Sequence, residues 1–524
     1  MTKSAPYNKW LVLGVLAIAL FMMNLDVTIV NIALPGIMNS LDASLADAEW
    51  VINVYILVFA ISLITMGRFG DIFGRKRLFI SGLVLFTIAS LACGLSPNIQ
   101  TLIVSRAFQA FGGAAMMPAT LSILNVAFRE GGRGQAMGVW GAVSGAASAL
   151  GPIIGGLLVD NLSWEYIFLV NIPLGVIAVI AGIIIINEST DPTAIKQIDW
   201  PGIASATAGL FGLTFALIEG QRFGWSSPVI IGAFGLCAIG LALFYYIENR
   251  SRAPLIQLNL FKNINFTAGN TVSALLMFGL IGILFLLVLY FQIVLGLSAV
   301  KTGLVLLPMS AVVVLIAPLA GRMAERDGVR WILASGMFII SIAIFLMADL
   351  SIDTTWQSLI VPLILAGVGM GLVMAPVNTV IMGAARVEQS GAASGIMTTM
   401  RQIGSLLGIA ILGAVLQTRL ASGLVSTVNS TDGIPQEIKK VIINAINEGA
   451  MNFGDMSGIN AGGMPDTAQA AMTQMFATEF ASSLNMAMIV AAIFCLIGAI
   501  AALFIKNPGQ TNSTCKDSNV FPKH

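Results

Sequence analysis

The sequence predicts an all-α integral membrane protein with fourteen transmembrane helices. Of its 524 residues, 57% are hydrophobic and only 10% are charged, and the mean hydropathy is +0.91. Soluble domains carry about 25% charged residues, so this composition excludes a water-soluble chain. The apolar segments are continuous and do not alternate with polar residues, which favours helices over membrane-spanning strands.

The spans are placed by length, because about 20 apolar residues cross a bilayer as a helix. The first span begins just after Lys9. No small-residue cleavage site follows it, so we expect a retained span rather than a signal peptide. The predicted spans are 10–32, 50–68, 78–96, 101–121, 137–159, 166–186, 201–219, 228–247, 265–291, 303–322, 331–349, 356–380, 392–416 and 482–505.

Basic residues predict the orientation of these spans, because cytoplasmic loops of membrane proteins carry an excess of Lys and Arg. With the N-terminus inside, most of the 26 Lys and Arg residues fall in inner loops or termini. The outer loops hold Arg222, Lys301, Arg419, Lys439 and Lys440. We therefore expect both termini on the cytoplasmic side of the membrane.

A short motif occurs twice and indicates an internal repeat. "GRFGDIFGRKR" (67–77) follows span 2, and "GRMAERDGVR" (321–330) follows span 10. The offset of 254 residues pairs Gly74 with Gly328 and also carries span 1 onto span 9. Spans 1–6 and 9–14 are therefore two related halves, with spans 7 and 8 inserted between them.

The repeat defines the predicted domains. They are a six-helix bundle over 1–190, two inserted helices over 191–250, a second six-helix bundle over 251–505 and a cytoplasmic tail over 506–524.

A long outer loop, 417–481, separates the last two spans. Within it, "PQEIKKVIINAINEG" (435–449) has apolar residues at helical spacing and reads as an amphipathic helix. A second helical pattern starts at Pro465 and runs toward span 14. We favour a connector packed on the outer surface, and a cap over the outer mouth is the alternative.

Enzyme signatures are absent from the sequence. The sole histidine is His524, the last residue, and neither a zinc-protease motif nor a phosphate-binding loop occurs. The four cysteines are scattered, which suggests no metal site or disulfide framework. The net charge of +1 gives no indication of nucleic-acid binding. We expect no cofactor, so active transport would draw on an ion gradient or on a partner chain.

Asp26, in "LDVTIVNIALP" (25–35), is the strongest candidate for chemistry. A charge at the centre of a membrane helix costs about 2.5–3.5 kcal/mol or more, and such groups are functional hypotheses by default. Asp26 is the only acid that we place deep in a span, so we predict a proton-coupling and substrate site. A neutral Asp that joins helices is the alternative. Asn31 lies about 140° around the helix from Asp26 and reads as a helix-contact or cavity residue.

Arg106 and Gln109 share one face of span 4 at a spacing of i, i+3 and are candidates for the same site. The first copy of the repeat motif is predicted to latch the inner side and to break on conformational switching. Its residues, with one from the second copy, are Gly67, Arg68, Asp71, Gly74, Arg75, Arg77 and Glu325.

Span 5 contains "GAVSGAASALGPIIGG" (141–156) and is predicted to be a closely packed, bent helix. Its candidate hinge residues are Gly145, Gly151, Pro152, Gly155 and Gly156. Spans 12 and 13 carry candidate cavity residues, where Met adapts to varied substrates, although packing of the core is the more common use of Met. These residues are Met374, Asn378, Met397 and Arg401.

Together these segments resemble the major facilitator superfamily, and within it the fourteen-helix drug:proton antiporter branch. The resemblance rests on 25–35, on 67–77, on "LIVSRAFQAFGGA" from 102, on "GAASALGPIIGG" ending at 156, on "WEYIFLVNIP" (164–173) and on "YFQIVLGLSAVKTGLVLLP" (290–308). Glu165 stands where an Arg is usual in that branch.

The resemblance implies two six-helix bundles around a central cavity, alternating access and proton-coupled export of lipophilic drugs across the bacterial cytoplasmic membrane. It places Arg106 in the proton relay and Gly151–Pro152 in the antiporter hinge. Relatives that export dicationic antiseptics carry further acids in their membrane helices. Spans 2, 10 and 13 lack such acids, which favours neutral, zwitterionic or singly charged lipophilic substrates.

Several alternatives stay open. A dedicated exporter of an endogenous metabolite, such as a siderophore, lipid or amino-acid derivative, would have the same motifs. A membrane enzyme or receptor and a sugar-type uptake symporter are less favoured. The expected partners are a small lipophilic substrate, protons and the lipid bilayer. An accessory periplasmic protein is left open.

Overall fold

The computed structural model describes residues 8–128, 133–189, 199–251, 258–385, 390–430 and 466–506, with positions 254, 256 and 439. All regular secondary structure in these residues is helical. Fourteen of their helical segments are long and apolar enough to cross a membrane. The predicted fold class is therefore confirmed.

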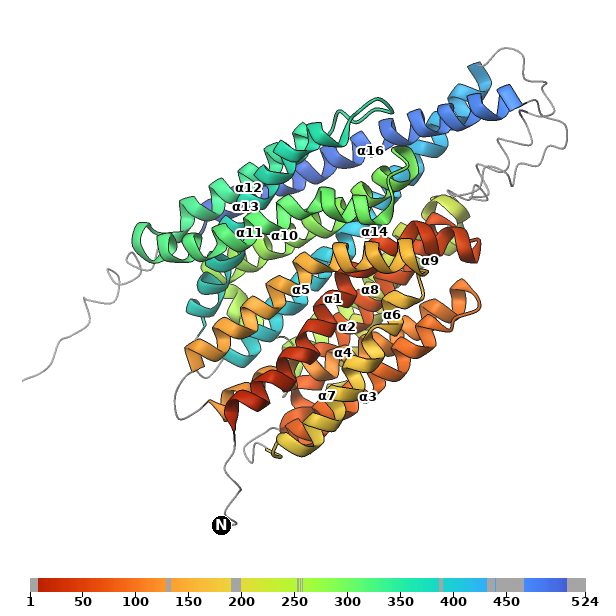
Figure 1. Ribbon diagram of the computed structural model, residues 1–524. Coiled ribbons are helices and arrows are strands. Elements are labelled where there is room, and N and C mark those ends of the chain that lie inside the picture. Colours follow the sequence, from red (N-terminus) through yellow and green to blue (C-terminus); the bar gives the residue numbers. More distant parts are fainter. Residues whose placement is uncertain are drawn as a thin grey trace, which may run out of the picture.

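The helices form two bundles with a helix pair beside them (Figure 1). The first bundle contains α1 (Lys9–Leu41), α2 (Leu45–Phe73), α3 (Arg75–Gly94), α4 (Ile99–Ala127), α5 (Arg133–Asn161), α6 (Tyr166–Leu169) and α7 (Asn171–Ile185). The inserted pair is α8 (Trp200–Phe223) and α9 (Pro228–Arg250). The second bundle contains η1 (Leu258–Lys262), α10 (Ile264–Leu289), η2 (Tyr290–Val294), α11 (Ala299–Asp327), α12 (Val329–Leu346), η3 (Trp356–Leu359), α13 (Ile360–Gly383), α14 (Ser390–Ser430) and α16 (Asp466–Leu503).

We call the side of the bundles where α1 begins the proximal face, and the side where α1 ends the distal face. The charge distribution predicts that the proximal face is cytoplasmic.

Side-chain caps fix where several helices begin. Ser44 and Asp47 form a reciprocal capping box at the start of α2, where the Asp47 amide donates to Ser44 Oγ at 3.2 Å and the Ser44 amide donates to Asp47 Oδ2 at 3.0 Å. Asn98 accepts from the amide of Thr101 and begins α4 in the same way. These caps satisfy N–H groups that a helix leaves without partners at its start.

Two glycines make equivalent turns in the two bundles. Gly74 joins α2 to α3 with φ +112°, and Gly328 joins α11 to α12 with φ +88°. Residues with a side chain rarely adopt positive φ, so both turns favour glycine. The two positions are those that the sequence repeat pairs, and each lies on the proximal face.

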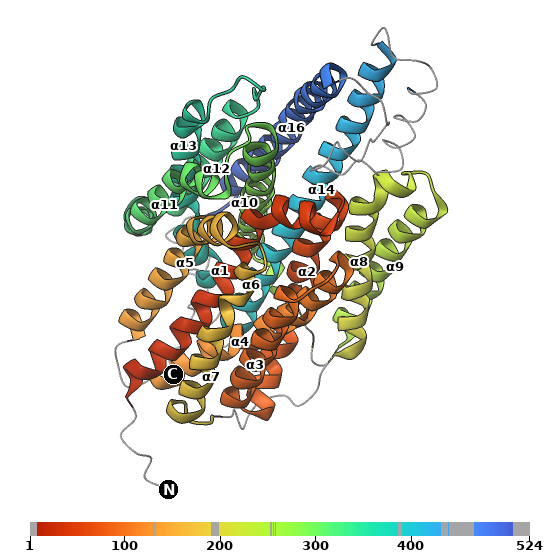
Figure 2. The ribbon, with the colours of Figure 1, turned by 45° about the vertical axis from the view of Figure 1, so that its right-hand side comes forward.

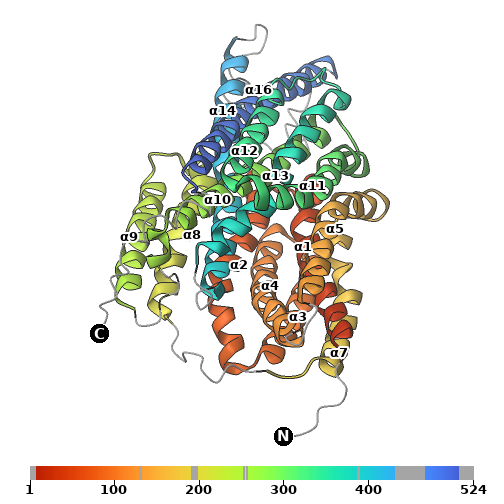
Figure 3. The same cartoon turned by 90° about the vertical axis from the view of Figure 1, so that its left-hand side faces the viewer.

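The inserted pair packs on the outside of the two bundles (Figures 2 and 3). α8 contacts both α2 and α14, and α9 packs on α8. Much of α9 is exposed, including Ile231, Ile239 and Leu243. Such an apolar surface belongs in lipid rather than in water.

The predicted loop 417–481 needs a correction at both ends. α14 continues to Ser430, and α16 begins at Asp466, so the two helices extend past the apolar spans. Apolar side chains every fourth residue, Leu420 and Leu424, are buried on this extension, and Thr427 Oγ1 donates to Glu479 Oε1 across the pair at 2.8 Å. Helices α14 and α16 thus pack on each other beyond the predicted apolar spans, and a prediction from hydropathy alone does not detect this packing. The predicted helix 435–449 lies outside the described residues apart from position 439, as does the tail after Lys506.

The two bundles contact each other near the distal face. Asp160, at the end of α5, accepts hydrogen bonds from the amides of Ala299 and Val300 at the start of α11, at 3.0 and 2.9 Å. Gln292 in η2 donates to the carbonyl of Ile32 at 2.9 Å. These contacts border a polar distal pocket of about 360 Å³.

Candidate functional site

Three of the predicted site residues meet inside the first bundle. Arg106 and Gln109 project from one face of α4 toward Asp26 near the middle of α1. Arg106 Nη1 lies 2.5 Å from Asp26 Oδ2, and Gln109 Nε2 donates to Asp26 Oδ1 at 2.8 Å. Arg106 Nη1 also donates to Gln109 Oε1 at 2.6 Å. The i, i+3 spacing on α4 therefore directs two donors at one carboxylate.

Other helices complete this cluster with residues that the sequence analysis did not select. Asn171, at the start of α7, directs Nδ2 toward Asp26 Oδ1 at 3.5 Å. Ser90 on α3 accepts from Gln109 Nε2 at 2.9 Å. On α2, the Val51 carbonyl accepts from Arg106 Nε at 3.2 Å, and the ring of Tyr55 lies 4.2 Å from the guanidinium carbon. Asn171 lies in the quoted segment 164–173, and its polar side chain in an apolar run was the available signal.

The cluster is closed to solvent. Asp26 and Gln109 are 0% exposed, and Arg106 is 1% exposed. A buried ion pair of this kind is tolerated because its charges compensate each other, and Arg106 Nε is bonded to the Val51 carbonyl as well. Taking up a proton on Asp26 would leave the Arg106 charge without its partner.

Asn31 lies outside this cluster. It is buried, and its Nδ2 donates to the Val27 carbonyl one turn earlier at 3.1 Å. Its Oδ1 has no hydrogen-bond partner. The sequence predicts that Asn31 lies about 140° around α1 from Asp26. Its position outside the cluster agrees with that separation.

The glycines of α5 pack on two different partners. At Gly151 and Gly155 a Cβ would overlap Thr28 and Ile29 of α1, which lie two and three residues after Asp26. At Gly156 a Cβ would lie 2.6 Å from the backbone of Val300 on α11. Helix α5 therefore joins the Asp26 segment to the second bundle through close backbone contact. Pro152 lies inside the helix at this level.

Gly145 differs from the other predicted hinge glycines. A Cβ added there meets nothing within 4 Å, and the residue lies toward the proximal end of α5. The open space at Gly145 and the tight contact at Gly156 therefore fall on one helix.

The repeat motif on the proximal face is held by a residue that sequence reasoning missed. Glu188, just after α7, accepts from the amides of Lys76 and Arg77 at 3.0 and 3.2 Å. The Arg77 side chain is 3.7 Å from the same carboxylate. A carboxylate at this position stabilises the start of α3, and Gly74 leaves the space for it.

The remaining motif residues are placed as follows. Gly67 packs near Pro118 of α4. Arg75 begins α3, and its amide donates to the Ser189 carbonyl at 3.0 Å. The side chains of Arg68, Asp71 and Glu325 lie outside the described part of the structure, so the predicted latch stays a prediction.

The second bundle has a polar centre of a different kind. Arg401 on α14 donates from Nε to Ser273 Oγ on α10 at 2.9 Å and from Nη2 to Asn378 Oδ1 on α13 at 2.5 Å. None of the ion pairs between described residues includes Arg401. Met374 and Met397 are half-buried on the same two helices, α13 and α14.

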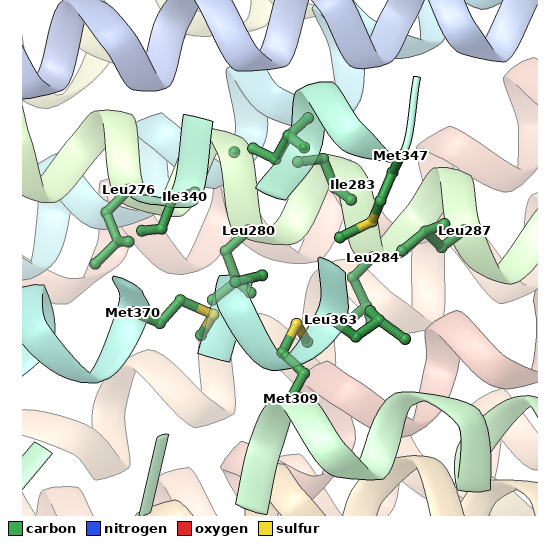
Figure 4. A pocket seen from close by; sticks show the side chains of 13 residues that line it. Leu276, Leu280, Ile283, Leu284, Leu287, Met309, Ile340, Met347, Leu363 and Met370 are labelled. Carbon is green, nitrogen blue, oxygen red and sulfur yellow. The ribbon is translucent and has the colours of Figure 1, made fainter. Parts of the chain in front are cut away.

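An apolar pocket lies inside the second bundle, between α10, α11, α12 and α13 (Figure 4). Met309, Met347 and Met370 border it together with Leu and Ile side chains. Its volume is only about 20 Å³, close to that of one water molecule. The predicted cavity residues Met374, Asn378, Met397 and Arg401 are not part of its lining.

Two acids near helix ends are buried as well. Glu49, near the start of α2, is 0% exposed, and Glu219 on α8 is also buried. Glu49 directly precedes the apolar run that begins at Trp50, so a span placed by hydropathy begins one residue too late. Burial between three helices, which the linear sequence does not show, encloses it.

The comparison with protein families decides the identity of the fold. The model for the Major Facilitator Superfamily matches residues 16–409. The chain belongs to this superfamily. Its members are membrane transporters that act on small substrates, and the chain is accordingly a multi-pass membrane protein.

Individual superfamily relatives cover nearly the whole chain. The chain is 33% identical to the tetracenomycin C resistance and export protein of Streptomyces glaucescens, over 95% of this chain and 92% of that protein. It is 29% identical to the multidrug transporter protein MdtP of Bacillus subtilis, over 99% and 97% of the two chains. It is 35% identical to the multidrug resistance protein Stp of Mycobacterium tuberculosis, over 78% and 76%.

Solved structures share the superfamily fold at lower identity. A bacterial homolog of the human lysosomal transporter Spinster, in an inward-facing and unoccupied conformation, aligns with a TM-score of 0.64 and 16% identity. The alignment covers 96% of this chain and 97% of that chain.

Proposed function

We propose that this chain exports lipophilic small molecules, among them drugs and antibiotics, across the bacterial cytoplasmic membrane in exchange for protons. The names of three relatives that cover at least three quarters of the chain, resistance and export proteins, support export of drug-like compounds. The lack of acids within predicted spans 2 (50–68), 10 (303–322) and 13 (392–416) favours neutral, zwitterionic or singly charged substrates.

The Asp26–Arg106 pair carries the proposal of proton coupling. It is an enclosed carboxylate whose charge is matched by one guanidinium at 2.5 Å. In the proposed cycle, Asp26 takes up a proton when the pair separates and releases it when the charge pair forms again. A cycle that separates and reforms the pair once would move one proton.

The packing of α5 links this cycle to movement of the bundles. Gly151 and Gly155 hold α5 against the helix that carries Asp26, and Gly156 holds the same helix against α11. A shift of α1 at Asp26 would therefore be transmitted to the distal contact between the bundles. With the proximal face cytoplasmic, closed distal contacts correspond to the inward-facing state, in which a substrate enters from the cytoplasm.

Uptake into inverted membrane vesicles tests the proposal. A panel of neutral, zwitterionic and singly charged lipophilic compounds is offered while a proton gradient is imposed, and uptake of at least one compound should collapse when a protonophore is added. Uptake that ignores the protonophore would contradict proton coupling. Failure of a drug-sensitive host to gain resistance to any compound of a broad panel would favour the dedicated metabolite exporter.

A further inference from the structure

Glu49 is a buried carboxylate that the proposed mechanism does not use. It is 0% exposed, and it lies on α2 where the first bundle meets α14 of the second. Gln417 Nε2 on α14 donates to Glu49 Oε1 at 2.9 Å. Glu49 Oε2 is buried and has no hydrogen-bond partner. One carboxylate oxygen is thus satisfied across the interface between the bundles, and the other is not satisfied at all.

Among the described residues, no cation forms an ion pair with Glu49. On α8, the nearby acid Glu219 accepts a hydrogen bond from Trp50 Nε1 at 3.0 Å. Its carboxylate also forms an ion pair with the Arg222 guanidinium at 3.7 Å. On α2, Asp47 is engaged in its capping box with Ser44. Two arginines on neighbouring helices, Arg106 and Arg419, do not supply a partner either.

Neither arginine contacts the Glu49 carboxylate. Arg106 on α4 binds Asp26 and the carbonyl of Val51, and Arg419 on α14 is exposed. No ion pair between described residues includes Glu49.

The partner helix is shaped to receive this carboxyl group. Gly413, one turn before Gln417 on α14, leaves the space that Glu49 fills, because a Cβ there would overlap the carboxyl group. Asn53, one turn along α2 from Glu49, is also fully buried, with both amide atoms lacking a partner. Burying a charge with so few bonds costs several kcal/mol, whereas a neutral carboxylic acid avoids most of this cost.

We infer that Glu49 is a second proton-binding site, loaded from the distal face, and that its protonation permits the two bundles to close there. The inference rests on the alternating-access part of the proposed function and not on the identity of the substrate. Closing the bundles removes Glu49 from water, and a bound proton cancels the charge that would otherwise be trapped between α2 and α14.

A proton on Glu49 and a proton on Asp26 are released to different sides of the membrane. Glu49 is enclosed while the distal contact is closed, so its proton returns to the distal side when the bundles part. It therefore makes the return to the closed state sensitive to external acidity without adding to the protons exchanged per substrate. Asp26 lies deep in the first bundle and is the group proposed to pass its proton across.

Asp160 provides a matched comparison at the same face. It also joins the bundles, but it is exposed and accepts two backbone hydrogen bonds at the start of α11. A helix N-terminus stabilises a negative charge. Asp160 is thus suited to close the bundles as a carboxylate, whereas Glu49 is suited to do so as an acid.

Hydrogen exchange of the full chain in lipid nanodiscs, without substrate or gradient, tests the inference. Exchange is followed by mass spectrometry in residues 44–52 and 412–420 from acidic to alkaline pH and corrected for the intrinsic pH dependence. In the wild type, protection of both segments should fall as the pH rises. The fall should be at most about tenfold per pH unit, because a single proton is lost. In Glu49→Gln, which mimics the protonated acid, both segments should stay protected at every pH. In Asp160→Asn, protection should fall slightly but keep the wild-type pH profile.

Two outcomes overturn the inference. One is a Glu49→Gln profile that follows the wild type, and the other is wild-type protection that does not change with pH, which decides the matter even if the variant does not accumulate. Either outcome leaves the vesicle uptake test of export untouched. Conversely, loss of proton-driven uptake with retained pH-dependent distal opening would remove the proposed function and leave the Glu49 site standing.

Discussion

The two six-helix bundles share a repeated fold but differ in their polar centres. In the first bundle, Asp26 and Arg106 form a closed, charge-balanced pair. In the second, Arg401 is held by the neutral groups of Ser273 and Asn378 and remains half-buried. A balanced pair that must separate to take up a proton suits coupling. Among the described residues, the hydrogen bonds of the Arg401 side chain go to neutral groups only.

This difference shows that the repeat fixes backbone geometry more strictly than chemistry. The paired glycines Gly74 and Gly328 keep the same left-handed turn. The residues of the polar centres are not related by the 254-residue offset, since Asp26 falls on Leu280. Two copies of one scaffold can therefore carry polar centres of different chemistry.

The largest expected effect is the difference in the free energy of unfolding that is lost when Arg106 or Arg401 is replaced. Arg106→Ala leaves Asp26 buried without its partner and should lower the free energy of unfolding by about 3–5 kcal/mol. Arg401→Ala leaves only neutral groups without a donor and should cost about 1–3 kcal/mol. Thermal unfolding of both purified variants in the same detergent measures the gap. Equal losses would mean that the two centres do not differ in the way described.

A double variant sharpens the same contrast. Asp26→Asn combined with Arg106→Gln removes both charges and should recover more than half of the stability lost in Arg106→Gln alone, because no buried charge remains unpaired. Asn378→Ala combined with Arg401→Gln serves as the control and should bring no such recovery. The quantity measured is the unfolding temperature of the four single and the two double variants. Additive losses in the first pair would contradict the ion-pair account.

The next effect concerns the contact between the bundles. Gly156→Ala forces a Cβ against the backbone of Val300 and should disfavour distal closure by about 1–3 kcal/mol. Gly145→Ala meets open space and should instead stabilise α5 by up to about 1 kcal/mol. Hydrogen exchange at the distal ends of α5 and α11 distinguishes the two. Equal exchange in both variants would show that Gly156 does not hold the bundles together.

The smallest expected effect is at the exposed distal contact. Asp160→Asn keeps a hydrogen-bond acceptor for α11 but removes the charge, and should weaken distal closure by about 0.3–1 kcal/mol at low salt. The loss should shrink as salt is added, because the site is exposed. Asp353→Asn, in the loop after α12, is a charge-matched control away from the contact. A loss that is independent of salt would point to packing rather than charge.

Much of the fold could be predicted because hydrophobic length and charge bias act locally along the chain. The fourteen spans are an example, and so is the shared face of Arg106 and Gln109. What the sequence could not show depends on contacts between helices. Glu49 lies just outside an apolar run and is enclosed by α14, and Glu188 reaches a helix start 112 residues earlier. The extension of α14 to Ser430 likewise follows from its packing on α16, which a hydropathy window does not register.

Proton coupling through Asp26 is the central claim, and one transport measurement addresses it directly. The wild type and Asp26→Asn are reconstituted into vesicles at equal density, and uphill transport driven by a pH step is compared with downhill exchange of the same compound. Asn keeps an acceptor for Gln109 but cannot carry a proton. We expect Asp26→Asn to retain downhill exchange while substrate-driven proton release and uphill transport are lost. Undiminished uphill transport in Asp26→Asn would contradict the account.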